Sequence, residues 1–196
     1  MRTPVVILAL ALLASCALLP SHAFAAALDK GTVEIEGSVS FDHASFSHSG
    51  EKLGTQTLFD GTLGAAYSLT RMFQVGGGLL FSASSFSPEG GSTSSDHAIG
   101  GSVDVTANFK TASGLVPFVR VGVGAMGFGG DNYPDAKTSV LAPLVRAGVR
   151  VLVADAGSVN LSLSYRHETN ADGVDGDDAN RFGLAVGISL FPVRGQ

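Results

Sequence analysis

Residues 145–166 read VRAGVRVLVADAGSVNLSLSYR, and this stretch decides the fold. Apolar side chains occupy every second position on both sides of a short turn, Asp155-Ala156-Gly157. Alternation with a period of two indicates β-strands whose two faces meet different surroundings. The intervening positions carry Arg, Asn, Ser and Gly, together with Leu152. The segment therefore predicts an antiparallel hairpin with one apolar face and one mostly polar face.

The same pattern recurs through the rest of the chain, from about Thr32 onward. Further alternating segments lie at 33–42, 59–69, 73–84, 99–109, 119–126 and 182–190. The connections alternate between long and short, and long loops are expected at 47–54, 87–96, 130–138 and 170–180. We therefore predict an all-β fold, an eight-stranded antiparallel up-and-down transmembrane β-barrel with short periplasmic turns and longer outside loops.

Composition excludes several other classes of protein. The chain has 196 residues, of which 45% are hydrophobic and only 15% are charged, so it is neither disordered nor unusually polar. Its 26 glycines follow no collagen-like period. The formal net charge of −5 lacks the basic excess of a nucleic-acid-binding protein, and we expect no nucleic-acid partner.

The first 25 residues have the organisation of an export signal. Arg2 precedes an apolar run from Val5 to Leu19, and Ala23-Phe24-Ala25 forms a small-x-small cleavage site. We expect a signal peptide at 1–25, cleaved near Ala25, and an outer-membrane barrel domain at 26–196. Lipoprotein processing at Cys16, within Leu13-Ala14-Ser15-Cys16, is the alternative. Cleavage near Ala25 would leave the mature chain without cysteine.

The charged residues indicate which face of the strands points inward. All basic residues within the expected strands are Arg, and they share the polar face with four carboxylates. Arg is favoured where fixed hydrogen bonds to carboxylates are made in a confined space. An eight-stranded barrel has an interior that side chains can fill. We therefore predict an internal charge network of Glu34, Glu36, Asp60, Asp104, Arg120, Arg146, Arg150 and Arg166, with the apolar face toward lipid. A periplasmic lipocalin-like ligand-binding barrel, with the apolar face inside, is an alternative.

Several short segments carry a family resemblance. The turn Tyr67-Ser68-Leu69-Thr70, the segment Val116-Pro117-Phe118-Val119 and the following Gly122-Val123-Gly124 are similar to those of small outer-membrane barrels of the OmpA N-terminal-domain and OmpX kind. The resemblance implies a location in the cell outer membrane of a Gram-negative bacterium. Such barrels usually carry aromatic girdles. Without Trp in this chain, Phe must serve that role.

A second, local resemblance covers Tyr165 to Ala171. This segment is similar to the His-x-Ser-Asn-Ala motif of PagL-type lipid A deacylases, in which His and Ser act on an acyl ester from the lipid-facing side. The resemblance implies His167 as the base and Thr169 as the nucleophile. Arg181 stands about where that family has its orienting acid, so Asp177 or Asp178 would have to replace it. A lipid A 3-O-deacylase-like esterase is therefore an alternative function.

The outside loops are acidic, most clearly between Asn170 and Asn180. Clustered carboxylates suit a hard cation such as Ca²⁺, although their order does not follow the EF-hand spacing. The candidate ligands are Asp172, Asp175, Asp177 and Asp178. A solvated, repelling rim is the simpler interpretation, and divalent cations at this rim could bridge to lipopolysaccharide.

The function predicted from the sequence is non-enzymatic. We expect a structural or surface-interaction role in the envelope, with a salt-bridged lumen that is closed or at most a narrow, porin-like pore. The expected partners are outer-membrane lipid, lipopolysaccharide and the barrel assembly machinery. We expect a monomer and no cofactor.

Overall fold

The computed structural model describes residues 28–48, 51–109, 111, 114–131, 133–154, 156–170 and 179–193. Within them the chain forms strands β1 (Val33–His48), β2 (Glu51–Ser68), β3 (Phe73–Pro88), β4 (Ser94–Asn108), β5 (Leu115–Gly130), β6 (Tyr133–Ala154), β7 (Gly157–Asn170) and β8 (Ala179–Val193). In this part of the chain, no helix has the length and apolar character needed to cross a membrane.

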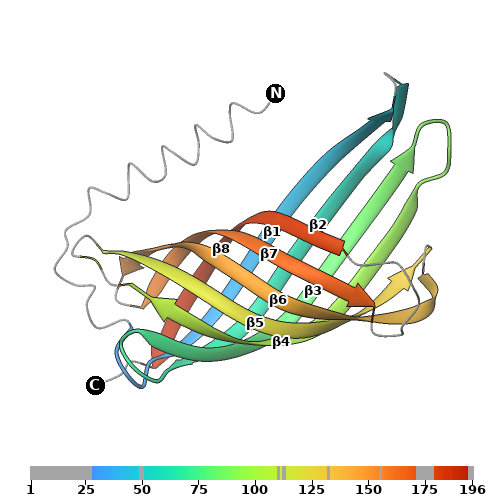
Figure 1. Ribbon diagram of the computed structural model, residues 1–196. Coiled ribbons are helices and arrows are strands. Elements are labelled where there is room, and N and C mark those ends of the chain that lie inside the picture. Colours follow the sequence, from blue (N-terminus) through green and yellow to red (C-terminus); the bar gives the residue numbers. More distant parts are fainter. Residues whose placement is uncertain are drawn as a thin grey trace.

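The eight strands form a closed antiparallel barrel in sequence order, β1 to β8, in which β1 also pairs with β8 (Figure 1). This confirms the predicted fold class. Because each strand pairs with its neighbour in sequence, short turns can join the strands. Residues 69–72, for example, connect β2 to β3, with Leu69 N–H donating to Phe73 O at 2.9 Å.

The outward face of the barrel is apolar, and the inward face is mostly polar. Large apolar side chains of every strand are exposed on the outside, among them Leu63, Ile99, Val103 and Leu163, each exposed by more than half. Glu34, Gln74, Asn108 and Arg150, by contrast, are almost completely buried inside. A water-soluble barrel buries its apolar side chains and exposes its polar ones. This barrel has the opposite distribution, which is characteristic of a barrel surrounded by lipid.

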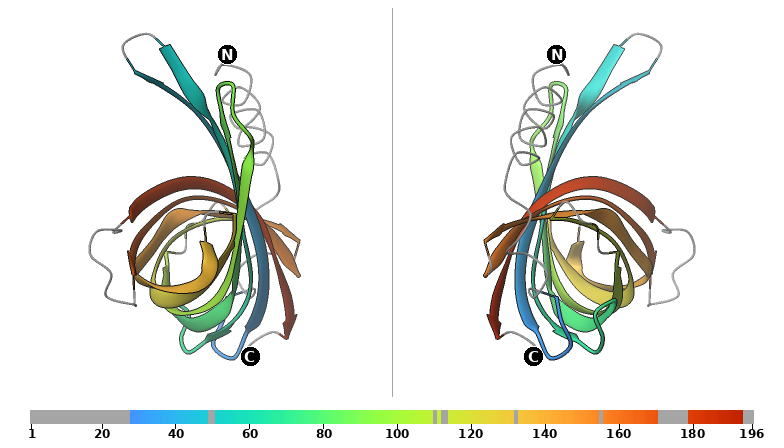
Figure 2. Two further views of the ribbon diagram at one scale, coloured as in Figure 1. Left: turned by 90° about the vertical axis from the view of Figure 1, so that its right-hand side faces the viewer. Right: turned by 90° about the vertical axis from the view of Figure 1, so that its left-hand side faces the viewer.

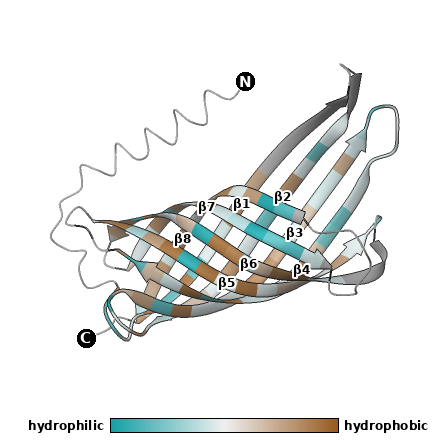
Figure 3. Cartoon of the chain, viewed as in Figure 1, coloured by the Kyte–Doolittle hydropathy of each residue, from teal (hydrophilic) through white to brown (hydrophobic). Residues whose placement is uncertain are grey.

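Two of the four expected long loops, 47–54 and 130–138, are largely strand, and half of 87–96 is strand as well, so that part of the loop prediction was wrong. β1 and β2 pair as far as His48 and Glu51, and β3 and β4 extend to Pro88 and Ser94. β5 and β6 likewise reach Gly130 and Tyr133. These outer ends are rich in Ser, Thr and Gly. Their sequences therefore lack the apolar alternation that predicts a strand, although the backbone pairing continues. The hairpins project beyond the barrel (Figures 1 and 2), and the outer ends of β3 and β4 are mostly pale in hydropathy colouring (Figure 3).

Strand β6 begins earlier than predicted and contains a bulge. Its register with β5 and with β7 shifts between Leu141 and Leu144, where Pro143 lacks the N–H that a regular ladder needs. The bulge changes the phase of the strand, so that Leu141 and Leu144 both join an internal apolar cluster. Simple alternation from Val145 backward cannot predict this arrangement.

Candidate functional site in the barrel lumen

An apolar cluster, which we call the floor, lies inside the barrel at the end where the short turns lie. Leu28, Val116, Leu152 and Phe191 pack together there, and each is at most 4% exposed. Phe191 follows the outward-facing Leu190, and the alternation of β8 therefore places its side chain inside. Four apolar side chains, from three strands and the segment before β1, therefore fill the interior at the end with the short turns.

A buried polar layer lies directly above this floor and is centred on Glu34. Nη1 of Arg150 pairs with Glu34 Oε2 at 2.5 Å, while Gln74 Nε2 and Ser189 Oγ donate to the same carboxylate at 3.0 and 2.6 Å. The guanidinium of Arg150 also stacks on Phe118, with Cζ 4.9 Å from the ring centroid. Both charged side chains are nearly inaccessible to solvent, so their electrostatic interaction is only weakly screened.

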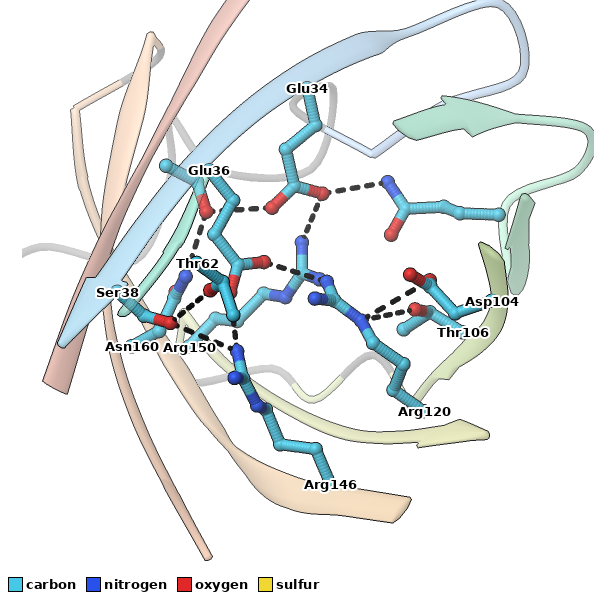
Figure 4. A network of polar contacts seen from close by, with 12 residues as sticks. Glu34, Glu36, Ser38, Thr62, Asp104, Thr106, Arg120, Arg146, Arg150 and Asn160 are labelled. Atoms are coloured by element: carbon cyan, nitrogen blue, oxygen red, sulfur yellow. Dashed lines mark hydrogen bonds and ion pairs between the residues drawn. The ribbon is translucent and has the colours of Figure 1, made fainter. Parts of the chain in front are cut away.

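The next layer is centred on Glu36 and spans the lumen (Figure 4). Glu36 on β1 accepts from Arg120 on β5 at 2.6 Å and from Arg146 on β6 at 3.0 Å. Arg120 additionally lies 3.4 Å from Asp104 and donates to Thr106 at 2.9 Å. One carboxylate therefore links opposite walls of the barrel, and Arg120 uses two of its nitrogens, Nε and Nη2, as donors.

A third group of charges lies nearer the outer end. Arg166 lies 3.2 Å from Asp60 across the lumen, and its Nε lies 2.7 Å from Glu168 Oε1. The same Glu168 oxygen lies 3.1 Å from Nε of Arg181 on β8. The opposite wall at this level is apolar, because Ala98, Met126 and Leu141 pack there with Leu80, Phe128 and Leu144.

The structure places all eight predicted charged residues inside the barrel, where they pair in three groups. These are Glu34 with Arg150, Glu36 with Arg120, Arg146 and, through Arg120, Asp104, and Asp60 with Arg166. The list of predicted charged residues was nevertheless incomplete, since Glu168 and Arg181 also belong to the network. The polar phase could have identified both, because Glu168 lies two positions after Arg166, and Arg181 two before the inward-facing Gly183. Neutral partners such as Gln74, Asn108 and Asn160 were also absent from the prediction, although the phases of their strands place them inside.

His167 and Thr169 point outward, on the lipid side of β7. Nδ1 of His167 lies 3.0 Å from Oδ1 of Asn180, which also accepts from the Tyr165 hydroxyl at 2.8 Å. The residue opposite His167 is thus the amide Asn180, while Arg181 faces the lumen opposite Arg166. Thr169 Oγ1 donates to Val140 O at 3.4 Å. Asp178, the candidate orienting acid, lies outside the described residues.

The candidate calcium ligands Asp172, Asp175, Asp177 and Asp178 also lie outside the described residues. Within the described part, no group of three or more His, Cys, Asp or Glu residues is arranged to hold a metal ion. The predicted signal peptide lies outside the described residues as well.

Comparisons with known proteins agree with the fold. The sequence profile of the outer membrane protein beta-barrel domain matches residues 8–189, and the chain therefore belongs to this family of outer membrane barrels. No curated protein sequence matches the chain significantly. Membership of the family indicates a location in the outer membrane.

Two solved structures illustrate the structural similarity. Neisserial surface protein A is 13% identical, with a TM-score of 0.57, over 83% of this chain and 97% of that one. The outer membrane protein OprG from Pseudomonas aeruginosa is 11% identical, with a TM-score of 0.50, over 83% of this chain and 96% of that one. At these identities the likeness concerns the fold alone. The predicted resemblance to small eight-stranded outer-membrane barrels is confirmed.

Proposed function

We propose that the protein is a non-conducting structural and surface-interaction barrel of the Gram-negative outer membrane. The observation that carries this proposal is the packing of side chains across the lumen. An apolar floor and successive ion-paired layers fill its periplasmic half. Diffusion of ions or solutes along the axis would require several buried ion pairs to separate, which is costly in a poorly solvated interior.

The outer end supports the interaction role. Hairpins β1–β2 and β3–β4 project beyond the barrel (Figures 1 and 2). Beyond Ser40, β1 pairs with β2 alone, so its other backbone edge has no strand partner there. Lipopolysaccharide is the proposed neighbour, because divalent cations could bridge its phosphates to the acidic rim. The proposed partners also include the barrel assembly machinery, and the proposed state in the membrane is a monomer exported by a signal peptide cleaved near Ala25.

Liposome swelling in a small sugar tests this proposal. Vesicles containing the folded wild-type barrel should swell no faster than empty vesicles. A variant in which Arg150→Ala is combined with Phe191→Ala removes one residue of the polar layer and one of the floor, and should admit the sugar if it folds. Folding is verified by heat-modifiable gel mobility. Rapid swelling with the wild-type protein would refute the closed lumen and favour the narrow-pore function.

A further inference from the structure

The seam between β1 and β8 is only partly paired. Hydrogen-bonded register runs from Val33↔Val193 to Ser40↔Ala185. Beyond this point β1 continues to His48 paired with β2, and β8 extends back to Ala179 paired with β7. The outer parts of β1 and β8 diverge in two different views (Figures 1 and 2). The two strands are therefore unpaired with each other at the outer end of this seam, and we call this unpaired stretch the slit.

The side chains that border the slit belong to the lipid-facing surface. Phe41 on β1 is 68% exposed, and Phe182 on β8 is 75% exposed, with Leu184 beside it. A transmembrane strand needs about 9–11 residues, so the slit begins near the ninth residue of β1, at the level of the outer leaflet. Unpaired backbone at such a depth is tolerated where it borders a cavity instead of lipid alone.

Such a cavity lies behind the slit. It has a volume of about 150 Å³, and its walls include Phe41, Phe182, Gly183 and Leu184 from the two diverging strands. Both diverging strands border it, β1 with Phe41 and β8 with Phe182, so the cavity adjoins the unpaired part of the seam. The interior supplies an apolar side, Leu58, Leu80 and Leu144, and a charged side, Asp60, Arg166 and Arg181. A volume of this order accommodates a molecule about the size of benzene, or several methylene groups of a chain.

The charged side of the cavity can accept a further carboxylate. Arg166 and Arg181 both approach one oxygen of Glu168 through Nε, at 2.7 and 3.1 Å. The Arg181 side chain is one-third exposed, and Glu168 is its ion-pair partner among the described residues. A guanidinium binds a carboxylate best through a pair of parallel N–H donors, so a side-on Nε contact leaves its terminal donors for a second anion.

We propose that this cavity is a dead-end binding site for a single-chain carboxylate amphiphile of the fatty-acid type. The ligand reaches the site from the outer leaflet through the slit between Phe41 and Phe182. Its chain lies against Leu58, Leu80 and Leu144, and its carboxylate pairs with Arg181. The Glu36 layer and the apolar floor close the other end, so the ligand is held and does not pass to the periplasm. This binding site is additional to the proposed structural role, and only its dead-end character rests on the closed lumen of that proposed function.

A tryptophan reporter can test this site directly, because the chain contains no native Trp. Leu80→Trp places the indole on the inner wall, and the neighbouring Leu79→Trp places it on the lipid face. A stearic acid carrying a nitroxide on its chain is titrated into vesicles containing each folded variant. We expect saturable quenching of the Leu80→Trp protein that excess palmitate reverses and hexadecanol does not. Quenching of the Leu79→Trp protein should follow the membrane concentration of the probe and ignore competitors.

Leu58→Trp is a second inner reporter for use if Leu80→Trp impairs folding. Adding Arg181→Gln to the reporter variant should raise the half-saturating concentration of the labelled acid by about tenfold. Absence of saturable quenching with both inner reporters would overturn the site. Equal competition by hexadecanol, or an unchanged half-saturation with Arg181→Gln, would overturn its carboxylate specificity.

Paired cysteines test the slit itself, in a background where Cys16 is replaced by Ser. Val39 and Val186 are register partners, so Val39→Cys with Val186→Cys should form a disulfide readily. Phe41→Cys with Leu184→Cys would lie opposite each other only if pairing continued, and this pair should stay reduced under the same oxidation. Equally rapid cross-linking of both pairs would show a closed seam and contradict the proposal.

Discussion

Replacing Glu36 with alanine should destabilise the barrel more than a typical surface substitution does. Glu36 is 7% exposed and lies 2.6 Å from Arg120 and 3.0 Å from Arg146. At such distances an ion pair contributes about 5 kcal/mol of Coulomb energy at an effective dielectric constant of about 20, before desolvation is counted. Arg120 keeps Asp104 and Thr106 as partners, whereas Arg146 keeps Ser38, so the loss is only partly compensated.

We expect Glu36→Ala to lower the free energy of unfolding by about 3–5 kcal/mol, the range observed when one member of a buried pair is removed. Urea unfolding in detergent, followed by circular dichroism and gel mobility, measures the change. Adding Arg146→Ala should recover part of the loss, because an unpaired buried guanidinium is then removed as well. Ser102→Ala, on the lumen wall of β4, is the control and should change the free energy by about 0.5 kcal/mol or less. A Glu36→Ala barrel within about 1 kcal/mol of the wild type would refute the role given to the network.

Three further predictions concern other parts of the molecule. Val103→Arg, on the lipid face of β4, should lower the free energy of folding into vesicles by about 2–4 kcal/mol, whereas Val103→Leu should change it little. If the Arg and Leu variants were equally stable, that face would lie in water. Met126→Ala should lower the free energy of urea unfolding by about 2–5 kcal/mol, because Met126 packs in the buried cluster beside Ala98 and Leu141. An unchanged free energy of unfolding would mean that this cluster is loosely packed. Cells that express the wild type or His167→Ala should yield lipid A of identical mass; loss of an acyl chain that requires His167 would establish the esterase alternative.

The sequence predicted the membrane-embedded part of the fold because each strand there meets lipid on one side and a polar interior on the other. Val145 to Tyr165 show this contrast directly, and the phase of Arg146 and Arg150 follows from it. The contrast ends at the outer extensions of β1 to β6, where both faces are polar or small, so residues 47–54 and 87–96 were assigned to loops. The bulge at Pro143 reverses the phase of β6 and could not be placed from alternation alone.

The candidate site was predictable in part for the same reason. The polar phase identified Glu36, Arg120 and Arg146, although not that one carboxylate bridges both guanidiniums. Pairing across the lumen depends on the barrel's register, which brings Arg166 on β7 to Asp60 on β2. The slit between β1 and β8 depends on how far two strands at opposite ends of the chain stay in register, and no local pattern contains that information.

The ionic conductance of the purified barrel in a planar lipid bilayer tests the closed lumen most directly. The wild-type protein, with folding verified by its heat-modifiable mobility, should give no conductance steps above the bare bilayer. The variant that combines Arg150→Ala with Phe191→Ala should give steps under the same voltage. Reproducible wild-type steps that disappear when the protein is omitted would contradict the closed lumen and show that ions cross the charge network.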